Sequence, residues 1–257
     1  MNLHYKTYGT GTPLIILHGL FGSLDNWATL SKAFGKHCKV FALDQRNHGR
    51  SPHSNTFNYE VMASDLDAFM QQHGIHSACV LGHSMGGKTA MQFALTYQEK
   101  TDKLIVVDVA PKTYDRRHDE ILDALSSLDL SLYSARRKVD EALATMIPDV
   151  AVRQFLLKNL RRSESGAFTW KINLGIIKKH YSEIADRPPA AGRVFMQPTL
   201  FIKGERSSYI GEHDHRIIMG LFPRATIVTV EGAGHWVHAD APQQLTRIVL
   251  DFLGASQ

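Results

Sequence analysis

The sequence has few cysteines, no long apolar run and no large excess of charge, and each of these absences limits what the protein can be. Its two cysteines, Cys38 and Cys79, are too few for a disulfide scaffold and fit a reducing compartment. No apolar run approaches the ~20 residues that a membrane-spanning helix requires. Residues 1–6 lack the apolar core of a secretory signal, so we expect a cytoplasmic protein.

The charge is also too modest to suggest a nucleic-acid partner. The net charge is +4 over 257 residues, and no segment interleaves basic with aromatic residues. Apolar residues make up 44% of the chain and charged residues 21%, as in a soluble globular protein with a sizeable core. Residues 111–190 hold 14 Lys and Arg against 11 Asp and Glu, a slight surplus that would suit an anionic substrate.

A strand-to-helix turn that exposes a serine is predicted at residues 82–87. The apolar run 78–81 leads into Gly82-His83-Ser84-Met85-Gly86, which fits the pattern G-x-S-x-G. Such a turn holds the serine hydroxyl at the tip of a sheet, where a substrate and a histidine can both reach it. Glycines are needed because the backbone reverses sharply and a Cβ would clash. Ser84 is therefore the candidate nucleophile.

The same residues also fit a phosphate-binding loop. Residues 82–89 match G-x-x-x-x-G-K-[ST] with Lys88 as the lysine. The apolar run 104–107 ends in Asp108, which resembles the strand-end acid that helps to hold magnesium in such proteins. Such a loop normally follows the first strand, whereas two predicted strands precede this one. It would also leave His18 and His235 without a role, so we reject this interpretation.

The order of predicted elements indicates an α/β protein. Short apolar runs predict buried strands at residues 13–17, 40–43, 78–81, 104–107, 199–202 and 227–230. Amphipathic patterns predict helices at residues 26–34, 59–73, 85–97 and 243–252. Asn58 is the expected N-cap of the second helix. Strands that alternate with helices imply a mostly parallel sheet covered on both faces.

The alternation stops between about residues 111 and 189. Four helices are predicted there with no strand between them, at residues 121–128, 135–146, 150–160 and 172–183. Because strands resume at residue 199, we expect a helical cap over the carboxyl edge of the sheet, where ligands of such folds bind. The predicted organisation is a core of residues 1–110 and 190–257 with a cap of residues 111–189.

Ser84 needs a base, and the base needs an acid to orient it. His235 has the best context, since it follows the last predicted strand in a glycine-rich loop; His238 is its nearest competitor. Asp108 ends the strand after the one that carries Ser84, at the same edge of the sheet. Glu205 and Asp214 are the alternatives for the acid.

A developing oxyanion would need two backbone amide donors. Met85, directly after the nucleophile, would supply one. The loop after the first predicted strand would supply the other, from the amide of Leu20 or alternatively of Phe21. His18 in this loop, and the polar loop of residues 44–51, are expected to be structural.

Several motifs occur together and in a fixed order. They are His18-Gly19-Leu20-Phe21-Gly22-Ser23, Asp44-Gln45-Arg46-Asn47-His48-Gly49, Gly82-His83-Ser84-Met85-Gly86-Gly87-Lys88, Val107-Asp108-Val109-Ala110-Pro111 and Gly232-Ala233-Gly234-His235. With them the whole chain resembles the α/β-hydrolase superfamily, and more narrowly the bacterial YbfF-type esterases. Many superfamily members carry the acid where Ser207 stands here. The YbfF-type group takes its acid from the position matching Asp108.

The resemblance implies an α/β-hydrolase fold with an inserted helical cap. It implies hydrolysis of carboxylic esters or acyl thioesters through an acyl-enzyme, with no cofactor and no metal. Acyl-CoA is one candidate substrate, because the predicted cap is slightly basic. Fold does not fix function. The alternatives are a carbon–carbon bond hydrolase or cofactor-free lyase on the same fold, and a ligand receptor with slow turnover.

Overall fold

A seven-stranded sheet forms the centre of this computed structural model, which describes residues 1–164, 166–186 and 192–255. Within these residues the strands lie in the order β1-β3-β2-β4-β5-β8-β9. They are β1 (Tyr5–Tyr8), β2 (Pro13–Leu17), β3 (Lys39–Leu43), β4 (Ala78–His83), β5 (Thr101–Val107), β8 (Thr199–Gly204) and β9 (Ala225–Val230). All neighbours pair in parallel except β1 and β3. The predicted mostly parallel sheet is confirmed, although β1 is absent from the prediction.

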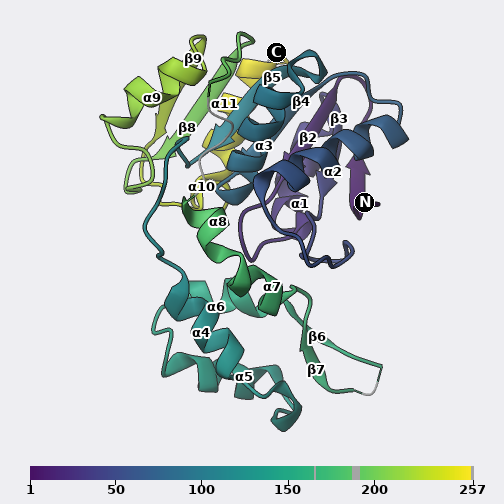
Figure 1. The fold of residues 1–257 in the computed structure, drawn as a ribbon, viewed down its shortest axis with the longest axis vertical. Helices are drawn as coiled ribbons and strands as arrows, with labels where there is room; N and C mark the ends of the chain where they lie inside the picture. Colours follow the sequence, from purple (N-terminus) through teal and green to yellow (C-terminus); the bar gives the residue numbers. More distant parts are fainter. Residues whose placement is uncertain (165, 187–191, 256–257) are drawn as a thin grey trace.

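Helices cover both faces of this sheet (Figure 1). They are α1 (Ala28–Phe34), α2 (Tyr59–Gln72), α3 (Met85–Thr96), α9 (Asp214–Leu221), α10 (Val237–Asp240) and α11 (Pro242–Leu253), with short 3₁₀ turns η1 (Leu24–Trp27) and η2 (Gln98–Lys100). Successive strand residues point to opposite faces. Ile15 accordingly packs in one buried cluster with Phe69 of α2, and Ile16 in another with Phe34 of α1. Asn58 caps α2 as predicted, since its Oδ1 accepts the Val61 amide at 3.0 Å.

The segment between β5 and β8 extends away from the sheet (Figure 1). It contains α4 (Asp119–Ser127), η3 (Leu130–Leu132), α5 (Arg136–Ala144), α6 (Val150–Leu157), β6 (Leu160–Arg162), β7 (Phe168–Trp170), α7 (Leu174–Lys179) and α8 (Tyr181–Asp186). Its buried apolar side chains form their own cluster, which continues into Phe21, Tyr59 and Met85 of the core. Phe21 follows β2 and Met85 follows β4. The helical segment therefore lies against the loops at the carboxyl ends of these strands.

Two details of the prediction for this segment are wrong. The expectation of no strand fails because β6 and β7 form an antiparallel hairpin, with Leu160 opposite Trp170. The predicted helix 172–183 is two helices, α7 and α8, which meet at His180. The expected boundary of the cap at residues 189 and 190 lies outside the described residues.

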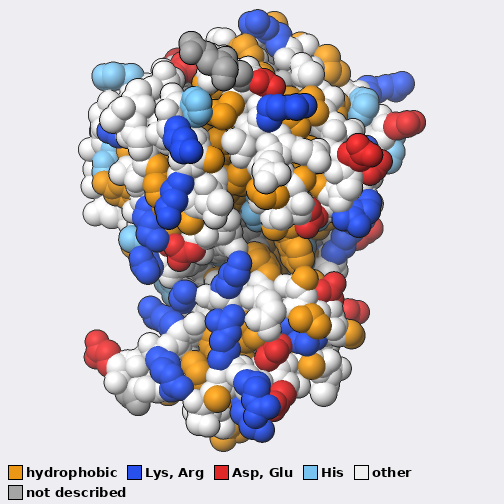
Figure 2. Space-filling view, turned by 180° about the vertical axis from the view of Figure 1, so that it is seen from behind, with side chains coloured by type: hydrophobic (Ala, Val, Ile, Leu, Met, Phe, Trp, Pro, Cys, Tyr) orange, Lys and Arg blue, Asp and Glu red, His pale blue; other side chains and the backbone are white. Residues whose placement is uncertain are grey.

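On the face shown in Figure 2, basic side chains are spread over the core and the helical segment, and apolar side chains are visible at the waist between them. Within residues 1–164, 166–186 and 192–255, no helix combines the length and the apolar character needed to cross a membrane.

Candidate active site

Ser84 lies at the turn from β4 to α3, with a backbone conformation that residues other than glycine rarely adopt. Its φ is 51° and its ψ is −118°. The turn is packed tightly against the first loop of the sheet, since a Cβ on Gly86 would collide with the carbonyl oxygens of Leu17 and His18. The Ser84 amide donates to the carbonyl of Val107 at 3.0 Å. The surrounding structure thus holds a strained residue in place, as is common at functional sites.

The side chains of Ser84, His235 and Asp108 form a chain of hydrogen bonds. Nε2 of His235 lies 3.1 Å from Oγ of Ser84, and Nδ1 of His235 lies 2.8 Å from Oδ2 of Asp108. A carboxylate only accepts hydrogen bonds, so Nδ1 carries the proton and Nε2 is the acceptor that faces the serine hydroxyl. Three residues that are far apart in the sequence thus meet in the hydrogen-bond geometry that a serine triad requires.

Asp108 is fully buried, and its carboxylate is held from two further sides. Oδ1 accepts the Gly204 amide at 2.9 Å, and Oδ2 accepts the hydroxyl of Ser207. Asp108 itself has a φ of 53°, a left-handed conformation, directly after β5. Ser207 stands where many superfamily members have their acid, and here it hydrogen-bonds the carboxylate that contacts His235.

The residues that the sequence left as alternatives make other contacts. The Glu205 carboxylate accepts the Gly232 amide at 2.9 Å. Asp214 pairs with Lys112 at 2.6 Å and accepts the Gly211 amide at 2.8 Å. His238 stacks on Trp27 with ring centroids 4.9 Å apart, and burial lowers its pKa to about 4. Among the described contacts, none of the three touches the imidazole of His235 in the way Asp108 does.

His83, within the serine motif, is a positioning residue that the sequence reasoning missed. It is buried, and its Nε2 donates to the backbone carbonyl of His235 at 2.9 Å. Its ring also contacts the His235 ring, with centroids 4.8 Å apart. Burial holds the pKa of His83 well below its usual value, so the ring stays neutral. The signal was its place beside Ser84 at the end of a buried strand.

The loop after β2 approaches Ser84 closely, as the predicted oxyanion site requires. A Cβ on Gly19 would lie 2.9 Å from Nδ1 of His83 and 3.3 Å from Cβ of Ser84, so only glycine fits there. Within the described residues, the amides of Leu20 and Phe21 donate to no other group. Met85 is the first residue of α3, where helix geometry leaves amides without intrahelical partners. These amides are available to a substrate oxygen.

Hydrogen bonds of His18, within this loop, and of the polar loop of residues 44–51 fix the backbone here. Nδ1 of His18 donates to the Gly19 carbonyl at 2.8 Å, and its Nε2 accepts the Gln45 amide at 3.0 Å. Burial lowers the pKa of His18 to about 4, so it remains neutral. Asp44 accepts the amides of Leu24 and Arg50 at 2.8 and 2.9 Å. These hydrogen bonds agree with the expected structural role of His18 and of the 44–51 loop.

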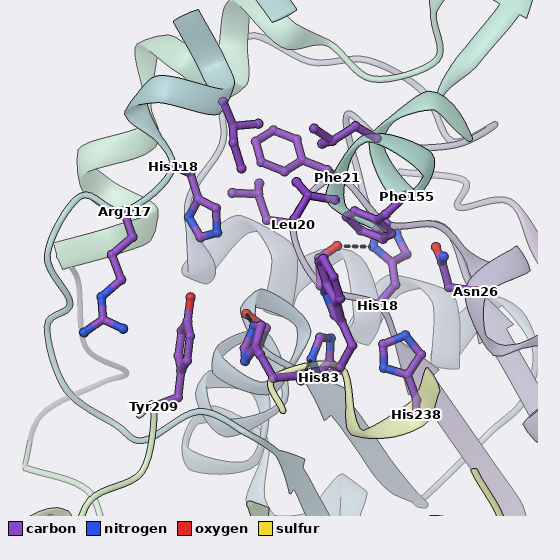
Figure 3. Close-up of a pocket in the computed structure, with 18 of the residues that line it drawn as sticks. His18, Leu20, Phe21, Asn26, His83, Arg117, His118, Phe155, Tyr209 and His238 are labelled. Carbon is purple, nitrogen blue, oxygen red and sulfur yellow. Dashed lines mark hydrogen bonds between the residues drawn. The ribbon is translucent and has the colours of Figure 1, made fainter. Parts of the chain in front are cut away.

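A cavity of about 250 Å³ opens beside Ser84. Its core side includes His235 and Trp236, and its other side includes Ile121, Val152 and Phe155 from the helical segment. Figure 3 shows the lining, with Phe155 and Leu20 above and His83 and His238 below.

A second, smaller cavity of about 50 Å³ also reaches Ser84. Tyr59, Tyr114 and Lys88 are among the residues that line it. Lys88 is only 2% exposed, and its Nζ donates to the Ala185 carbonyl at 3.2 Å and lies over the Tyr114 ring. Lys88 is therefore part of the cavity wall. In the described part of the chain, no group of three or more His, Cys, Asp or Glu side chains is placed to hold a metal ion.

A parallel sheet covered on both faces, with a serine at a strand-to-helix turn, is the architecture of the α/β hydrolases. The sequence model of the family described as alpha/beta hydrolase fold matches residues 12–146, more than half of the chain, and the chain belongs to this family.

Relatives and one solved structure agree with this assignment. The chain is 37% identical to a protein of Danio rerio named sn-1-specific diacylglycerol lipase ABHD11, over 98% of this chain and 83% of the relative. It is 35% identical to Esterase YbfF of Escherichia coli K12, over 94% and 93%. A solved structure named Marine microorganism esterase superimposes with a TM-score of 0.95 at 42% identity, over 97% of this chain and 98% of that one. The resemblance to YbfF-type proteins is confirmed.

Proposed function

We propose that this protein hydrolyses carboxylic esters through an acyl-enzyme on Ser84, with His235 as the general base and Asp108 as the acid that orients it. The observation that carries the proposal is the hydrogen-bonded chain from Ser84 Oγ through His235 to Asp108. The names of the relatives support it, since they include an esterase and a lipase.

The reaction follows from the placement of these atoms. His235 Nε2 takes the proton of Ser84 Oγ as the oxygen attacks the ester carbonyl, and Asp108 stabilises the imidazolium that forms. The amides of Met85 and Leu20 then stabilise the negative charge on the carbonyl oxygen, with Phe21 as the alternative to Leu20. His235 returns the proton to the leaving alcohol. A water molecule, activated by the same histidine, hydrolyses the acyl-enzyme.

The two cavities suit the two halves of an ester. His235 must deliver a proton to the leaving alcohol, and it lines the larger cavity. The alcohol part is therefore assigned to that cavity and the acyl part to the smaller one. A cavity of about 50 Å³ has room for roughly three to five water-sized groups. The expected acyl group is accordingly short. Attack on the carbonyl of an acyl thioester, including acyl-CoA, would use the same Ser84, His235 and Asp108.

The test is the hydrolysis of p-nitrophenyl esters of graded acyl length by the wild-type protein and the Ser84→Ala variant. We expect rapid release from short esters, and a loss of at least about 10⁴-fold in kcat for the variant. Circular dichroism and thermal unfolding would check that both proteins are folded. Residual hydrolysis near the wild-type rate would reject Ser84 as the nucleophile. No release from folded wild-type protein would favour a lyase or a receptor.

A further inference from the structure

His118 comes from the start of the helical segment, one residue before α4, and reaches the point where the two cavities meet. It lines both cavities, as do Ser84, Leu20 and Arg117. Figure 3 shows its imidazole pointing into the site between Arg117 and Leu20. Its ring is held by contacts with the rings of Phe21 and Tyr181, at centroid distances of 6.0 and 5.8 Å. The structure thus positions this side chain where the bound ester would lie.

The hydroxyl of Tyr181 determines which nitrogen of His118 carries the proton. Its oxygen accepts the backbone amide of His118 at 3.0 Å and lies 2.8 Å from Nδ1 of the same residue. Tyr181 is only 2% exposed, and within the described residues Nδ1 is the one acceptor for its hydroxyl hydrogen. Tyr181 therefore donates to Nδ1. The proton of the neutral imidazole is then on Nε2.

His118 is also uncharged in neutral solution. Burial, with a smaller effect from His235, lowers its pKa to about 4. Nε2 has no hydrogen-bond partner among the described residues, and it is not fully buried. The result is a fixed, neutral N–H donor that is open to the cavities. Such a donor can pair with an acceptor oxygen of a bound ligand.

We infer that His118 Nε2 donates a hydrogen bond to a second oxygen of the substrate, beside the scissile ester on the leaving alcohol, and so selects esters that carry one. The inference rests on the proposed function, which places the alcohol part in the larger cavity. The preferred substrates would be esters of alcohols with an ether, hydroxyl or second ester oxygen close to the scissile bond. A site built to pair such an oxygen discriminates against the analogue that lacks it, because the donor is then left unpaired.

A matched pair of substrates isolates this hydrogen bond. 2-Methoxyethyl butyrate and butyl butyrate have the same shape, and one CH₂ of the second replaces an oxygen of the first. The quantity to measure is the ratio of kcat/KM for the two esters. Their different intrinsic reactivities cancel when this ratio is compared between variants. A purely structural role of His118 would lower both rates and leave the ratio unchanged.

The variants are His118→Phe, which keeps a ring and removes the donor, and His118→Gln, whose amide nitrogen can replace Nε2. The ratio should fall roughly three- to tenfold in His118→Phe, the effect of one neutral hydrogen bond, and should be largely restored in His118→Gln. Tyr181→Phe removes the hydroxyl that keeps the imidazole proton on Nε2, so the ratio should fall by a smaller factor in this variant. His215→Phe, an exposed histidine outside the cavities, is the matched control and should leave it unchanged.

An unchanged ratio in His118→Phe would overturn the inference. If His118→Phe folds poorly, Tyr181→Phe perturbs the same donor, and an unchanged ratio in that variant would overturn the inference instead. In that case, continued Ser84-dependent hydrolysis of p-nitrophenyl butyrate would leave the proposed function intact. If folded wild-type protein hydrolyses none of these esters, the proposed function fails, and the inference fails with it.

Discussion

The Asp108→Asn substitution would change one atom of the site and reverse a hydrogen bond. The Gly204 amide donates to Oδ1 at 2.9 Å, so the carbonyl oxygen of an asparagine at this position would stay on that side. Its NH₂ group would then replace Oδ2, which now lies 2.8 Å from Nδ1 of His235. An NH₂ group donates, so Nδ1 would have to accept, and the imidazole proton would move to Nε2. Nε2 would no longer be able to take the proton of Ser84.

The expected cost is a fall in kcat of about 10⁴-fold, the loss that this change of tautomer causes in a serine triad. At about 1.4 kcal/mol for each factor of ten, this corresponds to about 5.5 kcal/mol of transition-state stabilisation. The assay is steady-state hydrolysis of p-nitrophenyl butyrate with the wild-type protein and with Asp108→Asn. KM should change much less than kcat, because Asp108 is fully buried and lines neither of the two cavities beside Ser84.

Glu205→Gln and Asp214→Asn are matched controls, since each removes one carboxylate near the same edge of the sheet. Their carboxylates accept the amides of Gly232 and Gly211 rather than contacting His235, so kcat should stay within about threefold. The reasoning would be refuted if folded Asp108→Asn kept a rate within tenfold of the wild type. A loss in Glu205→Gln or Asp214→Asn as large as that expected for Asp108→Asn would move the acid to that residue.

Three further predictions concern the support of the site, its shape and its stability. Ser207→Ala removes the hydroxyl that donates to Asp108 and should lower kcat roughly 5- to 50-fold, as measured with p-nitrophenyl butyrate; an unchanged kcat would show that this hydrogen bond is dispensable. Phe155→Ala enlarges the larger cavity and should raise kcat/KM for esters of bulky alcohols relative to ethyl esters; a shift in acyl-length preference instead would reverse the assignment of the cavities. Burial lowers the pKa of His18 to about 4 and of His48 to about 3, so below the unfolded value of 6.5 the unfolded chain binds protons that the folded chain does not. The free energy of unfolding in urea should therefore fall from pH 7 to pH 5, by up to ~1.4 kcal/mol per pH unit for each of the two residues, and a flat profile would contradict this.

The sequence predicted the parts of the site that depend on local backbone. Ser84 was recognisable because glycines flank it directly after a buried strand, and His235 because a glycine-rich loop precedes it. The choice of the acid among Asp108, Glu205 and Asp214 could not be settled from local sequence. All three lie near the same edge of the sheet, and only the pairing of β5 with β8 and the hydroxyl of Ser207 show which carboxylate faces His235.

The missed features depend on contacts across the fold or on very short elements. β1 is an antiparallel edge strand of alternating exposure, so a search for apolar runs passes over it. β6 and β7 have three residues each, too few for a period-2 pattern to stand out. The inferred role of His118 depends on its contact with Tyr181, 63 residues further along the chain, and nothing local to either residue signals their pairing.

Covalent labelling of the serine tests the central claim most directly. The protein would be treated with a fluorophosphonate, which phosphonylates activated serines, while esterase activity and intact mass are followed together. The account predicts one phosphonyl group for each chain, located on the peptide that contains Ser84, with activity lost in proportion to labelling and no label on Ser84→Ala. Label on a different residue, or full activity of protein labelled at Ser84, would contradict it.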